Sequence, residues 1–201
     1  MMKIKIPSIG AALLLLILQG CAILTNPASS SVKEQLTTLE TATLNKWQLT
    51  GKLGMRSAHQ ARVVKLQWQQ QNAQYQLSIS GPLGTGTATI RGNKDHMEMQ
   101  LGTKTYRGTP QELGLQLLGV PLPVNAISWW ARAIPSPNYP AANHVVINAQ
   151  GMPNSFQQAG WQLDFSDFKS VDEHILPKKV AGQHGDLSFK LVISKWDIYD
   201  N

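Results

Sequence analysis

Apolar and polar residues alternate with a period of two along much of the chain after residue 46. Trp47, Leu49, Leu53 and Met55 alternate with polar residues, which is the pattern of a strand with one buried and one wetted face. The alternation returns at residues 64–68, 75–79, 97–101, 161–165 and 187–193. Because turn residues separate these segments, the pattern predicts a meandering antiparallel sheet in which sequence neighbours lie side by side.

Three segments instead show helical spacing. Residues 31–34 have capping-box spacing, and the apolar positions after them predict a helix over residues 31–44. Residues 109–112 form a second capping box with Pro110 at the first helical position, followed by an apolar stripe that ends at Gly119. A third short helix is predicted to begin near Asn125.

These elements predict an α+β fold, mainly β, in which two short helices cover the concave face of one sheet. So few helices can leave a lipid-sized gap above a deeply curved sheet. A fully packed α+β core remains an equally good interpretation of the pattern.

The first 20 residues have the form of an export signal. Lys3 and Lys5 precede an apolar run over residues 11–18, which is shorter than the roughly 20 residues that a membrane-spanning helix needs. We therefore expect residues 1–20 to be a signal peptide, residues 21–31 a tether, and residues 32–201 a single domain.

Cys21 is the only cysteine, and it follows Leu18-Gln19-Gly20 in the arrangement of a lipobox. We predict that its thiol is lipidated and anchors the chain. A buried structural thiol, or an unused one, is the alternative. In bacterial lipoproteins an Asp after this cysteine favours retention at the inner membrane, so Ala22 favours the outer membrane, with the domain facing the periplasm.

The formal net charge is +6, and two of the lysines lie in the export signal. The remaining basic residues are scattered, which argues against a nucleic-acid partner. Mild attraction to anionic lipid head groups fits the charge better.

No arrangement of polar residues suggests an enzyme. The five histidines are isolated, and Gly84-Thr85-Gly86 completes no nucleotide-binding or nucleophile motif. The pair Asp164 and Asp167 is more typical of a solvated loop than of a glycosidase. We therefore predict no catalytic residue, no metal site and no cofactor.

Several short motifs occur in an order that resembles the LolB family of outer-membrane lipoprotein receptors. The resemblance covers residues 44–197 and the lipobox, and it rests on Trp47-Gln-Leu-Thr-Gly51-Lys-Leu-Gly54, Leu66-Gln-Trp68, Ser80-Gly-Pro82-Leu83-Gly84, Tyr106, Gly119-Val-Pro-Leu-Pro123, Trp129-Trp130, Gly160-Trp161, Leu176-Pro177 and Leu191-Val-Ile-Ser-Lys-Trp196.

The resemblance implies an open, incomplete antiparallel β-barrel, LolA/LolB-like, lidded by short helices around a hydrophobic cavity. It also implies a monomeric receptor that accepts lipoproteins from the periplasmic carrier LolA and inserts them into the inner leaflet of the outer membrane. Its partners would be the carrier, acyl chains and outer-membrane lipids. A structural accessory of envelope assembly, or an enzyme that modifies lipid or cell wall, are the alternatives.

Apolar residues on the predicted sheet and helices are candidates for an acyl-chain cavity, although ordinary core is the alternative for each. They are Leu49, Leu66, Ile79, Met99, Leu117, Ile127 and Ile193. Five tryptophans are expected to pack the seams between elements with the indole nitrogen hydrogen-bonded, namely Trp47, Trp68, Trp130, Trp161 and Trp196.

Pro82, Leu83 and Gly84 place a large aliphatic side chain in a turn between strands. The resemblance implies an exposed loop whose Leu83 engages the membrane or the incoming lipid. A leucine that folds back under the loop is the alternative. The docking surface for the carrier cannot be identified from the sequence. A basic rim of Arg56, Arg62, Lys178 and Lys179 is one candidate, and ordinary solvated side chains are the other.

Overall fold

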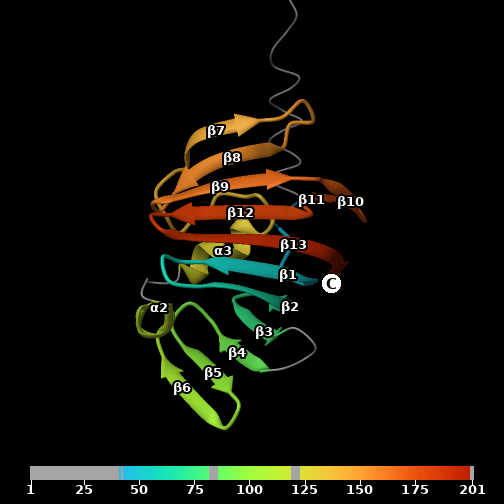
Figure 1. The fold of residues 1–201 in the computed structure, drawn as a ribbon. Coiled ribbons are helices and arrows are strands. Elements are labelled where there is room, and N and C mark those ends of the chain that lie inside the picture. The colour runs from blue at the N-terminus through green and yellow to red at the C-terminus, as the bar shows by residue number, and fades with distance from the viewer. Residues whose placement is uncertain (1–40, 42, 82–85, 119–122, 200–201) are drawn as a thin grey trace, which may run out of the picture.

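The computed structural model describes residues 41, 43–81, 86–118 and 123–199. Most of these residues lie in strands (Figure 1). The strands are β1 (Lys46–Arg56), β2 (Ala61–Gln71), β3 (Gln74–Ser80), β4 (Ala88–Gly92), β5 (Met97–Leu101), β6 (Lys104–Gly108), β7 (Asn143–Ile147), β8 (Pro153–Gln158), β9 (Trp161–Ser166), β10 (Lys169–Val171), β11 (His174–Leu176), β12 (Lys179–His184) and β13 (Leu187–Ile198), and the helices are α2 (Pro110–Leu118) and α3 (Val124–Trp130).

Eleven strands form one sheet in the order β6-β5-β4-β3-β2-β1-β13-β12-β9-β8-β7, and β10 and β11 form a separate hairpin. Every neighbouring pair in the large sheet is antiparallel. The end strands β6 and β7 do not pair with each other, so the sheet stays open. The prediction of an open antiparallel sheet is therefore confirmed.

The first strand of the chain, β1, and the last, β13, pair in the middle of the sheet. β1 pairs with β13 from Trp47 opposite Ile198 to Arg56 opposite Ser188, with a shift of register between Thr50 and Gly51. A Cβ atom on Gly51 would collide with the carbonyl oxygen of Val192. Glycine at this position therefore allows the two backbones to approach closely where the register shifts.

The helices lie in the connection between the two edge strands, because β6 precedes α2 and β7 follows α3. Thr109 and Glu112 form the predicted capping box: the Thr109 N–H donates to Glu112 Oε2 (2.8 Å), and the Glu112 N–H donates to Thr109 Oγ1 (3.2 Å). Ala126 and Trp130 of α3 are buried in the main core. The connection thus brings α3 onto the apolar face of the sheet.

All six alternating segments lie in strands, namely β1, β2, β3, β5, β9 and β13. Several shorter strands were not predicted because they carry too few apolar residues to alternate. Phe156 is the only large hydrophobic residue of β8, and Val180 that of β12.

The prediction of a helix near Asn125 is confirmed by α3. Of the helix predicted over residues 31–44, Thr41 is helical and Thr43 lies in a turn, while residues 31–40 and 42 lie outside the described residues, as do residues 1–30.

A buried amide fastens the segment after α3 to β8. Gln158 Oε1 accepts hydrogen bonds from Trp130 Nε1 (2.9 Å) and from the N–H of Ser136 (2.8 Å). Its Nε2 donates to the carbonyl oxygens of Ser136 and Pro140, both at 2.9 Å. All four hydrogen-bonding positions of this amide are therefore used inside the protein.

A buried guanidinium joins α3 to the segment that leads into β1. Arg132 Nη1 donates to the carbonyl oxygens of Thr41 (2.8 Å) and Leu44 (3.0 Å), and Nε donates to that of Ser128 (3.1 Å). Its Cζ lies 4.7 Å from the centre of the Trp129 ring. Burial lowers the pKa of Arg132 to about 10, so the group remains charged at neutral pH.

We predict that Gln158→Leu lowers the free energy of unfolding by about 3 kcal/mol, because it leaves several buried polar groups without partners. Denaturation with urea measures the change. Gln157→Leu is the matched control, since Gln157 points to the other face of β8 and bonds the side chain of Gln162; it should change stability by less than about 1 kcal/mol. Equal effects of the two substitutions would contradict this role of Gln158.

Candidate functional site

A row of apolar side chains crosses seven neighbouring strands on the inner face of the sheet. Cross-strand partners point to the same face, and the pairing places one residue from each strand in this inner row. From β13 to β6 the row is Trp196, Leu49, Trp68, Leu77, Ile90, Met99 and Tyr106.

The side chains of the inner row become more exposed from β13 toward β6. Trp196, Leu49 and Trp68 are buried, whereas the four residues on β3 to β6 are only half-buried. The next row runs from Ile193 at 1% exposed to Leu101 at 45%, with Ala88 between them at 9%. Tyr75, Ala88 and Met97 on these strands are buried, whereas the inner-row residues of β3 to β6, Leu77, Ile90, Met99 and Tyr106, form an apolar strip that is incompletely covered. We call it the open apolar face.

The candidate cavity residues divide between the core and the open apolar face. Leu49, Leu66 and Ile193 are at most 3% exposed and belong to the core. Ile79 and Ile127 are half-buried against it. Met99 lies farther along the inner row, between Ile90 and Tyr106. Leu117 lies in α2, and its side chain is outside the described part of the chain.

Three residues of the open apolar face were not among the candidates. They are Leu77, Ile90 and Tyr106. Leu77 already stood in a predicted strand, in phase with Ile79, so the alternation could have identified it. Ile90 and Tyr106 are each the only large apolar residue of their strands, β4 and β6, so neither strand shows an alternating pattern.

Three tryptophans form a contiguous cluster between β1, β2 and β13. The Trp47 ring centre lies 5.1 Å from that of Trp68 and 5.3 Å from that of Trp196. Trp68 Nε1 donates to Gln70 Oε1 (3.1 Å), and Trp196 Nε1 donates to the Pro177 carbonyl (3.1 Å). Trp47 Nε1 is buried with no acceptor among the described residues, so the prediction of a hydrogen-bonded indole is wrong for Trp47.

A polar groove of about 630 Å³ lies along β2 to β6. Its lining includes Tyr75, Gly92, Met97 and Gly108, which belong to one row of the inner face. Long polar side chains form its walls, among them Gln69, Gln71, Gln76, Arg91, Glu98 and Arg107. Such walls would leave an acyl chain among unsatisfied polar groups, so the groove does not suit lipid tails.

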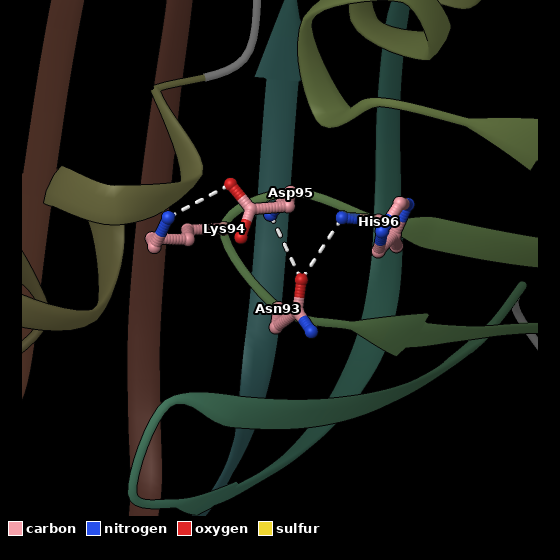
Figure 2. A network of polar contacts seen from close by, with 4 residues as sticks. All are labelled: Asn93, Lys94, Asp95 and His96. Atoms are coloured by element: carbon pink, nitrogen blue, oxygen red, sulfur yellow. Dashed lines mark hydrogen bonds and ion pairs between the residues drawn. The ribbon is translucent and has the colours of Figure 1, made fainter.

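A tight turn between β4 and β5 forms one end of this groove (Figure 2). Asn93 Oδ1 accepts hydrogen bonds from the N–H groups of Asp95 (2.8 Å) and His96 (2.9 Å). Lys94 pairs with Asp95 at 2.8 Å on the exposed side. The asparagine thus closes the turn through its own side chain. The contacts of these four residues are explained by the turn itself.

Chemically active side chains do not converge in the described part of the chain. No group of three or more His, Cys, Asp or Glu residues there could hold a metal ion. The lowered pKa of Glu112 follows from its hydrogen bonds with Thr109, and that of Asp167 from its pairing with Lys179. Both shifts belong to structural contacts.

Two predicted sites lie outside the described residues: the lipobox cysteine, Cys21, and the loop of Pro82, Leu83 and Gly84.

The candidate basic rim is not a continuous row. Arg56 and Arg62 flank the β1–β2 turn, whereas Lys178 and Lys179 lie at the start of β12, where Lys179 pairs with Asp167 (2.6 Å). None of the described helices is long and apolar enough to cross a membrane.

Comparison with known proteins connects this fold with lipoproteins. The family model described as outer membrane lipoprotein LolB matches residues 45–196. Proteins named Outer-membrane lipoprotein LolB from Chromohalobacter salexigens and Pseudomonas paraeruginosa are each 30% identical, over 157 and 193 residues. The first alignment covers 78% of this chain and 72% of the relative, and the second 92% and 93%.

A solved structure supports the same architecture. The LolA superfamily protein from Nitrosomonas europaea superposes with a TM-score of 0.55, covering 86% of this chain and 94% of that one. The sequences are 9% identical, so the likeness is one of fold.

Tyr75 provides a pH-dependent test of packing behind the groove. Burial raises the pKa of Tyr75 to about 12, and its hydroxyl has no partner among the described residues. A phenol with a raised pKa stabilises the fold below its ordinary pKa of about 10 and loses that contribution as the pH rises toward 12. We predict that Tyr75→Phe removes part of the stability loss between pH 10 and 12, measured by thermal unfolding. The same loss in Tyr75→Phe would contradict the assignment.

Proposed function

The chain belongs to the LolB family of outer-membrane lipoproteins, and on this premise we propose that its open apolar face receives the acyl chains of other lipoproteins before they enter the outer membrane. The half-buried inner row on β3 to β6 is the observation that carries this proposal. Its apolar side chains continue the core without a break, yet the described helices leave them partly exposed.

The free energy of lipid burial explains why such a face is needed. Each buried methylene contributes about 0.8 kcal/mol, so a chain of about fifteen carbons contributes on the order of 12 kcal/mol. A lipoprotein with several such chains would cross water far too slowly. The acyl chains must therefore pass directly from one apolar surface to another.

We propose that the donor is the soluble periplasmic carrier LolA. In this scheme each acceptor binds the acyl chains more favourably than its donor, so transfer runs downhill from the carrier to this protein and then to the bilayer. Met99 suits this task, because an unbranched and flexible side chain can repack around chains of different length.

We also propose that lipidated Cys21 holds the domain at the periplasmic side of the outer membrane. A single acyl chain gives only marginal attachment, whereas the several chains of a mature lipoprotein cysteine give a stable anchor. Transfer then occurs within reach of the inner leaflet.

Transfer of a labelled lipoprotein tests the proposal directly. A mature Cys21→Ala form is incubated with purified carrier that holds a radiolabelled lipoprotein, and a pull-down shows which protein retains the label. Movement of the label to this protein supports a receptor. Label that stays on a competent carrier would refute it and favour an accessory role in envelope assembly.

We predict that Ile90→Glu reduces capture of the labelled lipoprotein at least tenfold, because it places a charge at the centre of the open apolar face. Thr89→Glu is the matched control, since Thr89 lies next to Ile90 on the outer face, opposite Ser78 and Gln100. It should capture normally. Circular dichroism checks that both variants fold, and full capture by a folded Ile90→Glu variant would exclude this face as the acyl site.

We predict that Leu83→Glu still accepts the lipoprotein but deposits it poorly, since insertion of one leucine contributes only about 1.5 to 3 kcal/mol and a carboxylate removes this contribution. Deposition into vesicles of outer-membrane phospholipids, measured after capture, separates the two steps. Leu83→Ile should keep both steps. Normal deposition by Leu83→Glu would rule out a role of Leu83 in release.

A further inference from the structure

Three lysines gather on the outer face of the sheet, where β13, β1 and β2 lie side by side (Figure 1). Lys52 on β1 stands opposite Lys65 on β2 and Val192 on β13. One step along the strands, Gly54 stands opposite Val63 and Lys190. We call Lys52, Val63, Lys65, Lys190 and Val192 the basic patch.

Among the described residues, the lysines of the basic patch have no acidic partner. Two other lysines of the sheet are paired, Lys179 with Asp167 (2.6 Å) and Lys195 with Asp197 (2.6 Å). No ion pair among the described residues involves Lys52, Lys65 or Lys190, and all three are exposed. Like charges directly opposite each other destabilise a sheet, so Lys52 and Lys65 together favour an anion from outside the chain.

The basic patch is also partly apolar. Val63 is 60% exposed and Val192 38%. Between them, a Cβ atom on Gly54 would meet nothing closer than the Lys190 carbonyl at 3.8 Å and Val63 Cγ2 at 3.9 Å. The surface thus combines ammonium groups with short apolar side chains and has no bulky side chain at its centre.

We propose that the basic patch is the surface with which the protein lies against anionic phospholipid head groups. The lysines would contact the phosphates, and the two valines the less polar layer beneath them. A protein partner would need about 800 Å² on each side and some 20 residues, whereas a bilayer can be met by a few residues of a chain that a lipid anchor already holds there. The proposal rests on the membrane location given above.

The strength of this contact suits orientation of an anchored domain. A lysine near an anionic bilayer favours binding about fivefold, so three favour it roughly a hundredfold. This preference gives weak binding from solution, and it is sufficient to select one orientation of a domain that is already anchored. Lys65 stands opposite Ser80, the last residue of β3. Contact through the basic patch would therefore hold that end of β3 near the bilayer, two residues before Pro82 in the sequence.

Vesicle sedimentation tests the basic patch. The mature Cys21→Ala protein is mixed with vesicles of phosphatidylethanolamine containing one quarter phosphatidylglycerol, at low salt. A variant with Lys52→Gln, Lys65→Gln and Lys190→Gln should partition into these vesicles roughly a hundredfold less. On neutral phosphatidylcholine, or at high salt, the variant and the unaltered protein should behave alike.

The matched control removes the same charge elsewhere, through Lys94→Gln, Lys104→Gln and Lys169→Gln. These three lysines are also exposed, and their loss should leave at least a tenfold advantage over the patch variant. An equal loss in both variants would mean that only net charge matters and would overturn the proposal. If the triple variant does not fold, the single variants Lys52→Gln and Lys65→Gln should each lose about fivefold.

The lipoprotein-transfer assay distinguishes the proposed membrane contact of the basic patch from the proposed receptor function. A patch variant that binds anionic vesicles normally but no longer receives the labelled lipoprotein would show that the patch contacts the carrier, which would refute the membrane contact. A patch variant that receives the lipoprotein normally yet binds vesicles poorly supports it. Failure of transfer in the unaltered protein would refute the proposed function and leave the vesicle result standing.

Discussion

The antiparallel pairing of β1 with β13 is the interaction on which the rest of the structure depends. It joins β1 to β6 on one side with β7, β8, β9, β12 and β13 on the other, so that two meanders share one sheet. The tryptophan cluster packs over this seam, and Gly51 allows the close approach within it. Both the core and the open apolar face extend from this central pairing.

An apolar surface that must remain available conflicts with the ordinary requirement to bury hydrophobic side chains. In this sheet, different regions meet the two requirements. The residues around the seam are buried and stabilise the fold, whereas the inner-row residues on β3 to β6 stay half-buried. Substitutions on the open apolar face should therefore affect lipid binding more than stability.

The sequence predicted the architecture wherever alternation was strong, as in β1, β2 and β13. It did not distinguish Leu49, which is core, from Met99, which lies on the open apolar face, because both alternate in the same way. That difference depends on where α3 lies, which is set by contacts such as that of Trp130 with Gln158. The basic patch likewise depends on strand pairing, since Lys190 on β13 is far from Lys52 and Lys65 in the sequence.

The contacts of Arg132 would have a mechanical consequence if lipid on Cys21 anchors the domain, as proposed above. The guanidinium holds the carbonyl oxygens of Thr41 and Leu44, just ahead of β1, and sits beside α3. Tension along such a tether would act on these two hydrogen bonds as well as on β1, which begins two residues after Leu44. α3 would therefore bear part of the force on a domain that is pulled away from its membrane.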